Sequence, residues 1–333
     1  MAGSVPVRKY ARWLILVGAP VEDGANIGGS ALGPSALRMI GLARKLRTLG
    51  CEVSDRGDLI PSAFSHLHSV GRSGRVLRAS NVARWLSSLS NAAYNFARGG
   101  RVPVFLGGDH SLAMGTVDGI AQACAESGRE LFVLWLDAHP DFNTPATSLS
   151  GNLHGMPLAF LCGEPGFEGI LPVPLNPIDP SKLFLLGIRS VDAGEDEIIR
   201  RRSANLVDMR EIRQRGVAAT MQRILDTVAE RNGMLHVSLD ADFVDPASIA
   251  AVNVPVPEGV SLADAHLIMQ MLRVSGRVVS LDVAELNPLL DAEGKSARAI
   301  AELITSLFDQ TIEAPYDHPR PESSYQHGSA QLS

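Results

Sequence analysis

The chain has 333 residues, of which 45% are hydrophobic and 20% charged, and its formal net charge is −6. It carries no dense run of lysine and arginine, so we predict no nucleic-acid partner and no membrane partner. The three consecutive arginines at 200–202 are interpreted as a solvated helix face. Each apolar run is far shorter than the roughly 18 residues that a membrane-spanning helix needs.

The cysteines indicate a reducing environment. Cys51, Cys124 and Cys162 are odd in number and widely spaced, so they suggest neither a disulfide framework nor a Cys-x-x-Cys metal motif. We interpret them as buried free thiols and predict a cytoplasmic protein. The apolar run that begins at Trp13 is short and has no Ala-x-Ala cleavage site after it, so it predicts a first β-strand rather than a signal peptide.

Short apolar runs alternate with longer helical patterns along the chain. The apolar runs lack strict alternation, as expected for strands that are covered on both faces. They occupy residues 13–17, 102–106, 131–136, 183–188, 235–239 and 278–283. The helical patterns occupy residues 34–49, 79–98, 112–127, 216–231, 261–274 and 295–311.

This alternation predicts the α/β class. We expect a single three-layer domain over residues 1–311, built on a mostly parallel, doubly wound sheet. Residues 163–180 are rich in glycine and proline and predict a surface loop. Residues 312–333 carry several prolines and polar residues without periodicity, so we predict a flexible C-terminal tail, or one that a partner subunit orders.

Acids and histidines follow these apolar runs. In an open parallel sheet, ligands bind at the carboxyl ends of the strands, so residues in these positions should converge on one crevice. On extended backbone, positions two apart share a face, which would bring Asp137, His139 and Asp141 together. The convergent set is His110, Asp137, His139, Asp141, Asp240, Asp242, Glu285, Asp192, Glu195, Asp109 and Asp245.

The first six residues of that set predict a site for two metal ions. Four carboxylates packed together repel, and a pair of divalent cations removes the conflict. Oxygen ligands with one imidazole for each metal suit Mn²⁺ better than an all-thiolate zinc site would. Either motif alone, Asp-x-His-x-Asp or Asp-x-Asp, also fits an ordinary polar loop; together, each directly after a buried strand, they favour the metal site.

Three stretches of the sequence resemble the arginase/agmatinase (ureohydrolase) family. They read GGDHS at 107–111, DAHPDFNTP at 137–145 and SLDADFVDP at 238–246, and the resemblance covers most of residues 13–310. It implies an arginase-like fold with two Mn²⁺ ions in each subunit, bridged by Asp137 and Asp240. One manganese would be held by His110, Asp137, Asp141 and Asp240. The other would be held by Asp137, His139, Asp240 and Asp242.

The resemblance also implies a substrate. The stretch from Ser150 to Gly155 is similar to the arginase version of this loop, and it implies that Asn143 and Ser150 bind the α-carboxylate of L-arginine. Asp192 would bind the α-amino group, with Glu195 helping. Because agmatine lacks the carboxylate, an agmatinase needs no such loop.

The implied reaction splits L-arginine into L-ornithine and urea. A hydroxide that bridges the two metals would attack the guanidinium carbon, because bound divalent ions lower the pKa of water from 15.7 to about 7. Asp141 would orient this hydroxide, and Glu285 would pair with the guanidinium through two planar hydrogen bonds. His154 would bring the proton that the leaving amine needs.

Four positions depart from the arginase pattern. Asn253 and Val254 stand where a Gly-Thr pair is usual, Glu258 stands where a glycine is usual, and Ser190 stands where an Asp is common. Val254 thereby replaces a hydroxyl that is expected near Glu285. These departures either weaken guanidinium binding or mark a different guanidino substrate.

Other functions remain open at this point. An agmatinase or guanidinobutyrase is the main alternative, and a related deacetylase-type hydrolase with one zinc is a more distant one. A metal- or arginine-binding regulator without turnover is the non-enzyme alternative. The family resemblance implies a homotrimer or homohexamer.

Overall fold

The structure is a computed structural model that describes residues 12–63 and 76–311. Its centre is one sheet of eight strands, and all the neighbouring strands run parallel. The order across the sheet is β2-β1-β3-β8-β7-β4-β5-β6. The strands are β1 (Trp13–Ala19), β2 (Glu52–Asp58), β3 (Val102–Gly107), β4 (Leu131–Leu136), β5 (Leu183–Ile188), β6 (Asn205–Asp208), β7 (Met234–Asp240) and β8 (Val278–Ala284).

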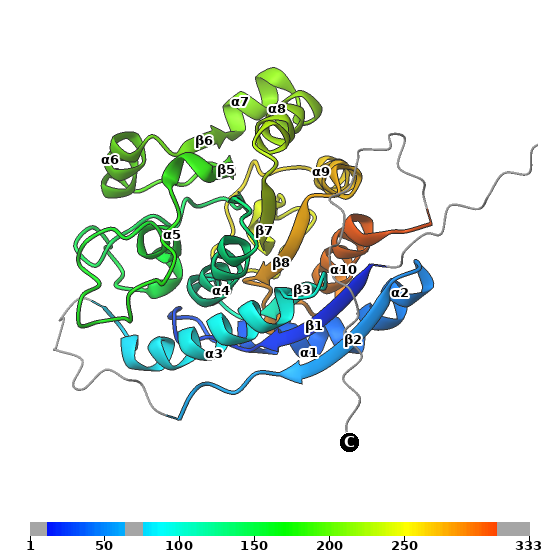
Figure 1. The fold of residues 1–333 in the computed structure, drawn as a ribbon, viewed down its shortest axis with the longest axis horizontal. Coiled ribbons are helices and arrows are strands. Elements are labelled where there is room, and N and C mark those ends of the chain that lie inside the picture. Colours follow the sequence, from blue (N-terminus) through cyan, green and yellow to red (C-terminus); the bar gives the residue numbers. More distant parts are fainter. Residues whose placement is uncertain (1–11, 64–75, 312–333) are drawn as a thin grey trace, which may run out of the picture.

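Helices cover both faces of the sheet and make three layers (Figure 1). Successive residues of a strand face opposite layers, so Leu14 and Leu16 pack into one core while Ile15 and Val17 pack into the other. One face carries α1 (Gly33–Met39), α2 (Leu42–Thr48), α7 (Met209–Arg215), α8 (Val217–Glu230), α9 (Leu262–Ser275) and α10 (Lys295–Phe308). The other carries α3 (Ala79–Ala97), α4 (Ala113–Glu126), α5 (Pro157–Leu161) and α6 (Ala193–Arg202). The prediction of a three-layer α/β fold is confirmed.

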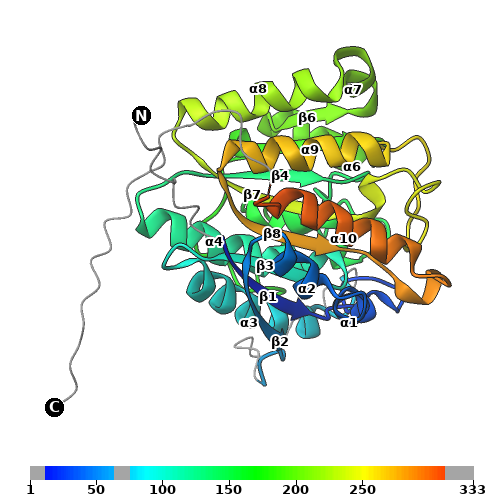
Figure 2. The same cartoon turned by 90° about the vertical axis from the view of Figure 1, so that its right-hand side faces the viewer.

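The six predicted strands are all present, but β2 and β6 were missed. Both are edge strands, as Figure 2 shows for β2, and an edge strand has less apolar surface to bury. The predicted helix 34–49 is in fact two helices, α1 and α2. The chain breaks at Gly41, whose φ of 79° lies in the left-handed region that favours glycine.

The mainly polar α7 and the short α5 were also missed. The three arginines at 200–202 are exposed at the end of α6, so their interpretation as a solvated helix face is confirmed, although the rest of α6 was not predicted. The glycine- and proline-rich segment 163–180 has no helix or strand between Cys162 and Asp179, as predicted. It is not confined to the surface, however, because Phe167 and Ile170 are buried in the core on the α3–α6 face.

The strand order creates a crevice. β3 and β4 are consecutive along the described sheet-forming chain, yet β8 and β7 lie between them in the sheet. Ligand sites of doubly wound sheets lie at such switch points, where loops at the carboxyl ends diverge. The crevice therefore opens where β3, β8, β7 and β4 end.

No helix within 12–63 and 76–311 is long and apolar enough to cross a membrane. The predicted tail at 312–333 lies outside the described residues, so its flexibility stays a prediction.

Candidate active site

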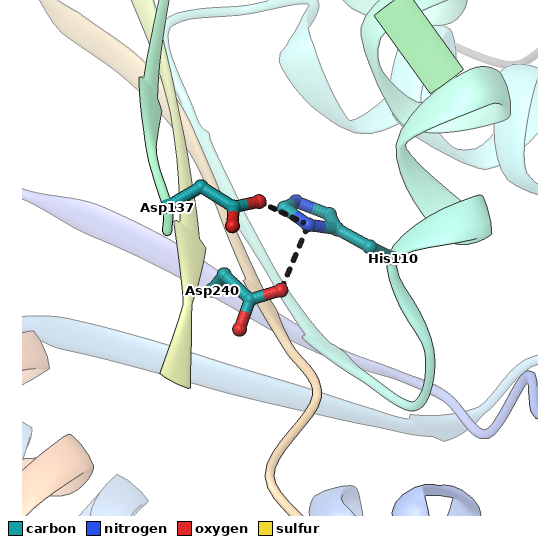
Figure 3. A group of neighbouring side chains, drawn as sticks. All are labelled: His110, Asp137 and Asp240. Atoms are coloured by element: carbon teal, nitrogen blue, oxygen red, sulfur yellow. Dashed lines mark ion pairs between the residues drawn. The ribbon is translucent and has the colours of Figure 1, made fainter. Parts of the chain in front are cut away.

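Side chains predicted to bind metal lie together at the carboxyl ends of β3, β4 and β7. His110 opens a short 3-10 turn after β3, and Asp137 follows β4 directly. Asp240 is the last residue of β7, and Asp242 lies in the turn that comes next. Figure 3 shows the side chains of His110, Asp137 and Asp240 pointing toward one another. The topology thus joins residues that are far apart in the chain.

The first group surrounds one ring nitrogen of His110. Its Nδ1 atom lies 3.0 Å from Oδ2 of Asp240 and 3.1 Å from Oδ2 of Asp137. Oδ2 of Asp141 lies 3.2 Å from the same nitrogen. His110, Asp137 and Asp240 each offer one atom to a space that could hold one metal ion.

The second group surrounds His139. Its Nδ1 atom lies 3.0 Å from Oδ2 of Asp242 and 3.5 Å from Oδ1 of Asp137. Asp137 therefore presents one oxygen to each group, which is what a bridging carboxylate needs. Asp240 contributes to the first group only, so its predicted bridging role stays a prediction.

The two acidic loops share a local design. The backbone N–H of His139 donates to Oδ1 of Asp137 at 2.7 Å, and that of Asp242 donates to Oδ1 of Asp240 at 2.8 Å. Such Asx turns fix each carboxylate through a residue two positions on. Asp141 has a φ of 48°, so the loop after β4 is not extended. The expectation of convergence on extended backbone was wrong; turns bring these side chains together.

Two buried atoms test whether a cation fits this cluster. Nε2 of His110 lies 2.8 Å from Oγ of Ser238, and the ring stacks on Trp135 at a centroid distance of 4.0 Å. Among the described residues, neither Nδ1 of His110 nor Oδ2 of Asp137 has a hydrogen-bond partner. Buried polar atoms rarely stay unpartnered. If Nε2 donates to Ser238, a neutral His110 points its Nδ1 lone pair at carboxylates, and a cation between them satisfies both.

The electrostatics of the cluster lead to the same conclusion. Burial, together with the charges of Asp242 and Asp137, raises the pKa of Asp240 well above its usual range. Burial and the charge of Asp137 raise the pKa of Asp141 to about 6. Burial alone would lower the pKa of His139, but contacts with Asp137 and Asp242 raise it to about 12. Without cations the cluster has to retain protons, whereas divalent cations balance the same charges.

A cavity of about 320 Å³ lies over this cluster. The predicted substrate-binding residues line it along with several metal-binding ones. At one end are His154 and Glu285, and the loops around Ser150 and Asp192 supply other lining residues. The complete lining is His139, Asp141, Asn143, Ser148, Ser150, Asn152, His154, Gly155, Ser190, Asp192, Glu195, Asp240, Asp242, Val254 and Glu285.

Two contacts hold the carboxylate of Glu285 through one of its oxygens and leave the other oxygen without a partner among the described residues. Its Oε1 atom accepts the backbone N–H of His110 at 2.9 Å and lies 2.9 Å from Nδ1 of His154. Its buried Oε2 atom has no hydrogen-bond partner among the described residues. Burial would lower the pKa of His154, but the charge and hydrogen bond of Glu285 raise it to about 9. The pair is therefore arranged to bind a cationic group and to hold a proton beside it.

The loops that carry Asn143 and Asp192 are joined. Nδ2 of Asn143 donates to Oδ2 of Asp192 at 3.1 Å. Glu195 is buried, and its two oxygens accept the backbone N–H groups of Phe142 and Asp192, each at 3.0 Å. Glu195 therefore organises both loops, and burial raises its pKa to about 7.

Sequence reasoning missed several residues of this site. Ser148 and Asn152 line the cavity, but polar residues in a polar loop carry no distinguishing signal. Ser238, which orients His110, could have been noticed as a polar residue within a buried apolar strand.

Comparisons with known proteins agree with this geometry. The model of the Arginase family matches residues 13–309. The arginase of Brucella melitensis is 45% identical, in an alignment that covers 93% of this chain and 99% of that protein. The arginase of Agrobacterium fabrum is 46% identical, with 89% of this chain and 91% of that protein covered.

Solved structures give the same result. The arginase of Bacillus caldovelox superposes with a TM-score of 0.81 at 35% sequence identity, covering 91% of this chain and all of that one. The arginase of Bacillus subtilis gives a TM-score of 0.79 at 33% identity, with the same coverage. The family model spans the sheet and the candidate metal ligands, the relatives and solved structures cover about nine-tenths of the chain, and we conclude that this chain belongs to the Arginase family.

Proposed function

We propose that this protein hydrolyses L-arginine to L-ornithine and urea with two Mn²⁺ ions in each subunit. The observation that carries the proposal is a pair of ligand groups that share Asp137, beneath a cavity in which Glu285 keeps an unpartnered oxygen. His110, Asp137, Asp141 and Asp240 would hold one ion, and Asp137, His139, Asp240 and Asp242 would hold the other. When bound, the ions supply hydroxide at neutral pH by lowering the pKa of water to about 7.

Glu285 binds and orients the guanidinium. A carboxylate and a guanidinium form two parallel hydrogen bonds in one plane. Oε1 of Glu285 is fixed by the backbone N–H of His110, a residue whose ring faces the metal cluster. The position of the guanidinium carbon is therefore coupled to the position of the cluster, which is a positioning effect.

Asp141 orients the attacking oxygen, and His154 supplies a proton to the leaving group. Oδ2 of Asp141 faces the first ligand group, where it accepts a hydrogen bond from the attacking oxygen and directs a lone pair at carbon. Nδ1 of His154 holds a proton beside Glu285 and gives it to the leaving amine. Part of the charge that retains this proton is balanced when the cationic substrate binds Glu285, so the proton becomes easier to transfer.

The other end of the substrate meets neutral and acidic groups. The α-carboxylate binds Asn143 and Ser150, and the α-amino group binds Asp192. Glu195 helps by holding the backbone of Asp192. An amino acid carries a negative carboxylate and a positive amino group at this end, so it needs a partner for each. Agmatine has no carboxylate and needs no partner for one.

The test is urea release from L-arginine, agmatine and guanidinobutyrate, measured side by side on protein whose metal content is known. We expect arginine to give the highest kcat/KM, with two manganese ions bound per chain. A higher kcat/KM for agmatine or guanidinobutyrate would identify that compound, rather than arginine, as the substrate. Arginine binding without urea release would identify a regulator, and a single bound zinc would indicate the deacetylase type.

We also propose a cytoplasmic homotrimer or homohexamer. All three cysteines are buried and unpaired, which suits a reducing compartment. Light scattering of the full chain gives the subunit number, and a stable monomer would refute the assembly. Fractionation of cells gives the compartment.

A further inference from the structure

One apolar side chain stands among the residues that line the cavity. Among the described residues that line it, Val254 has the single apolar side chain; the others are acids, histidines, amides, serines and one glycine. Val254 is 44% exposed, so its methyl groups face open space rather than the core. A lone apolar group in such a cavity implies that part of the ligand facing it is apolar.

One backbone bridge lies close in sequence to both Val254 and Glu285. Val252 pairs with Leu286 in an antiparallel bridge, and the backbone N–H of Asn287 donates to the carbonyl of Ala251 at 2.8 Å. The bridge is isolated and the chain bends at 253–254, so Val254 lies two residues along the chain from the bridge and Glu285 lies one residue from it. Val254 and Glu285 also line the same cavity.

The loop that carries Val254 is held on two sides. Nδ2 of Asn287 donates to Oδ1 of Asn253 at 2.6 Å. The guanidinium of Arg189 donates to the carbonyl of Val256 at 2.8 Å and to that of Asp242 at 2.6 Å. The wall formed by Val254 is thus fixed relative to both Glu285 and the metal cluster.

An apolar wall here changes which guanidinium groups fit. An arginine guanidinium carries five N–H donors, and Glu285 can accept only those on one edge. An N–H that faces Val254 finds no acceptor on that side chain. An N–CH₃ group in the same place loses no hydrogen bond and buries its methyl against the valine.

We infer that Val254 makes this site accept guanidino amino acids with one terminal N-alkyl group, of which Nω-methyl-L-arginine is the simplest. The inference rests on the proposed function. Water adds to the guanidinium carbon, the bond from that carbon to the side-chain nitrogen breaks, and the departing amine takes a proton. The products are L-ornithine and N-methylurea, so no further reactant is needed.

The experiment compares kcat/KM for L-arginine and Nω-methyl-L-arginine in the wild type and in Val254→Thr, a change that conserves volume and adds a hydroxyl. We expect the wild type to cleave the two substrates with efficiencies within about tenfold, because an apolar pocket discriminates one methyl group weakly. In Val254→Thr the ratio of methylarginine to arginine should fall about tenfold or more. Val173→Thr, an equivalent change at an exposed valine that does not line the cavity, should leave the ratio unchanged.

Binding gives a readout that does not depend on turnover. In the background of His154→Ala, calorimetry should show a similar fall in relative affinity for methylarginine when Val254→Thr is added. The inference is overturned if arginine is cleaved and methylarginine is neither cleaved nor bound, or if Val254→Thr affects both substrates equally. If urea is released from no guanidino substrate, the proposed function itself fails.

Discussion

The two ends of the substrate cavity are built differently. At the metal end, beneath the cavity, Asp137 follows β4 directly, His110 comes three residues after β3, and both are fully buried. At the amino-acid end, Ser150 and Asp192 are exposed and lie on loops. A metal cluster needs fixed positions, which strand ends provide, while loops can change without disturbing the sheet. If the proposed function holds, the metal end determines the reaction, and the loop end together with Val254 determines the substrate.

The largest effect is expected for Asp137→Ala. Removing the carboxylate that faces both ligand groups should lower kcat/KM about a thousandfold or more, because a metal ion supplies several kcal/mol of transition-state stabilisation. Elemental analysis should show loss of metal together with activity. The control is Asp118→Ala, another buried aspartate, which holds Ser90 and the backbone of Leu175. It should cost stability and retain metal. Full activity in Asp137→Ala would show that the reaction does not depend on the metal end.

The contrast between the ends also explains what could be predicted from sequence. Central strands such as β4 are continuous apolar runs, and the acids after them are visible as motifs. The edge strand β2 is almost wholly exposed and polar, so its pattern gives no signal. The left-handed backbone at Asp141 depends on tertiary context and does not follow from residue type, whereas the glycine at 41 was a signal for the break that the helical pattern of 34–49 concealed. The apolar wall at Val254 was visible only as a departure from a family pattern, because its neighbours come from distant segments.

His154→Ala should slow the reaction at the metal end without removing the metal ions. General acid catalysis contributes roughly a hundredfold to ten-thousandfold, so kcat should fall by at least about a hundredfold. His266→Ala is the control, because that ring bonds Ser306 between α9 and α10, away from the cavity. Metal content should be unchanged in both variants, and loss of an ion from His154→Ala would make His154 a ligand instead.

A smaller effect is expected for Ser238→Ala, which tests whether metal binding at the buried end depends on the orientation of the His110 ring. Without Oγ of Ser238, Nε2 of His110 loses its partner at 2.8 Å, and outer contacts of this kind are worth about 10- to 100-fold in metal affinity. Ser280→Ala is a close control, since Oγ of Ser280 bonds the buried ring of His236 at 2.7 Å on the neighbouring strand. Each change should destabilise the fold by about 1–3 kcal/mol, as expected when a buried polar atom loses its partner. Only Ser238→Ala should weaken metal binding in a titration; equal metal affinity in both variants would refute the positioning role.

The smallest effect is expected at the loop end, for Asn143→Ala. In the proposed function its amide binds the α-carboxylate, far from the bond that breaks, so its loss should raise KM for arginine about tenfold with little change in kcat. Loss of the hydrogen bond to Asp192 would loosen the same loops, and agmatine separates the two causes because it lacks the carboxylate. If Asn143 acts on the carboxylate, arginine alone becomes a poorer substrate. If Asn143 acts only through Asp192, KM for agmatine rises by the same factor, and the specificity of this end then depends on Ser150.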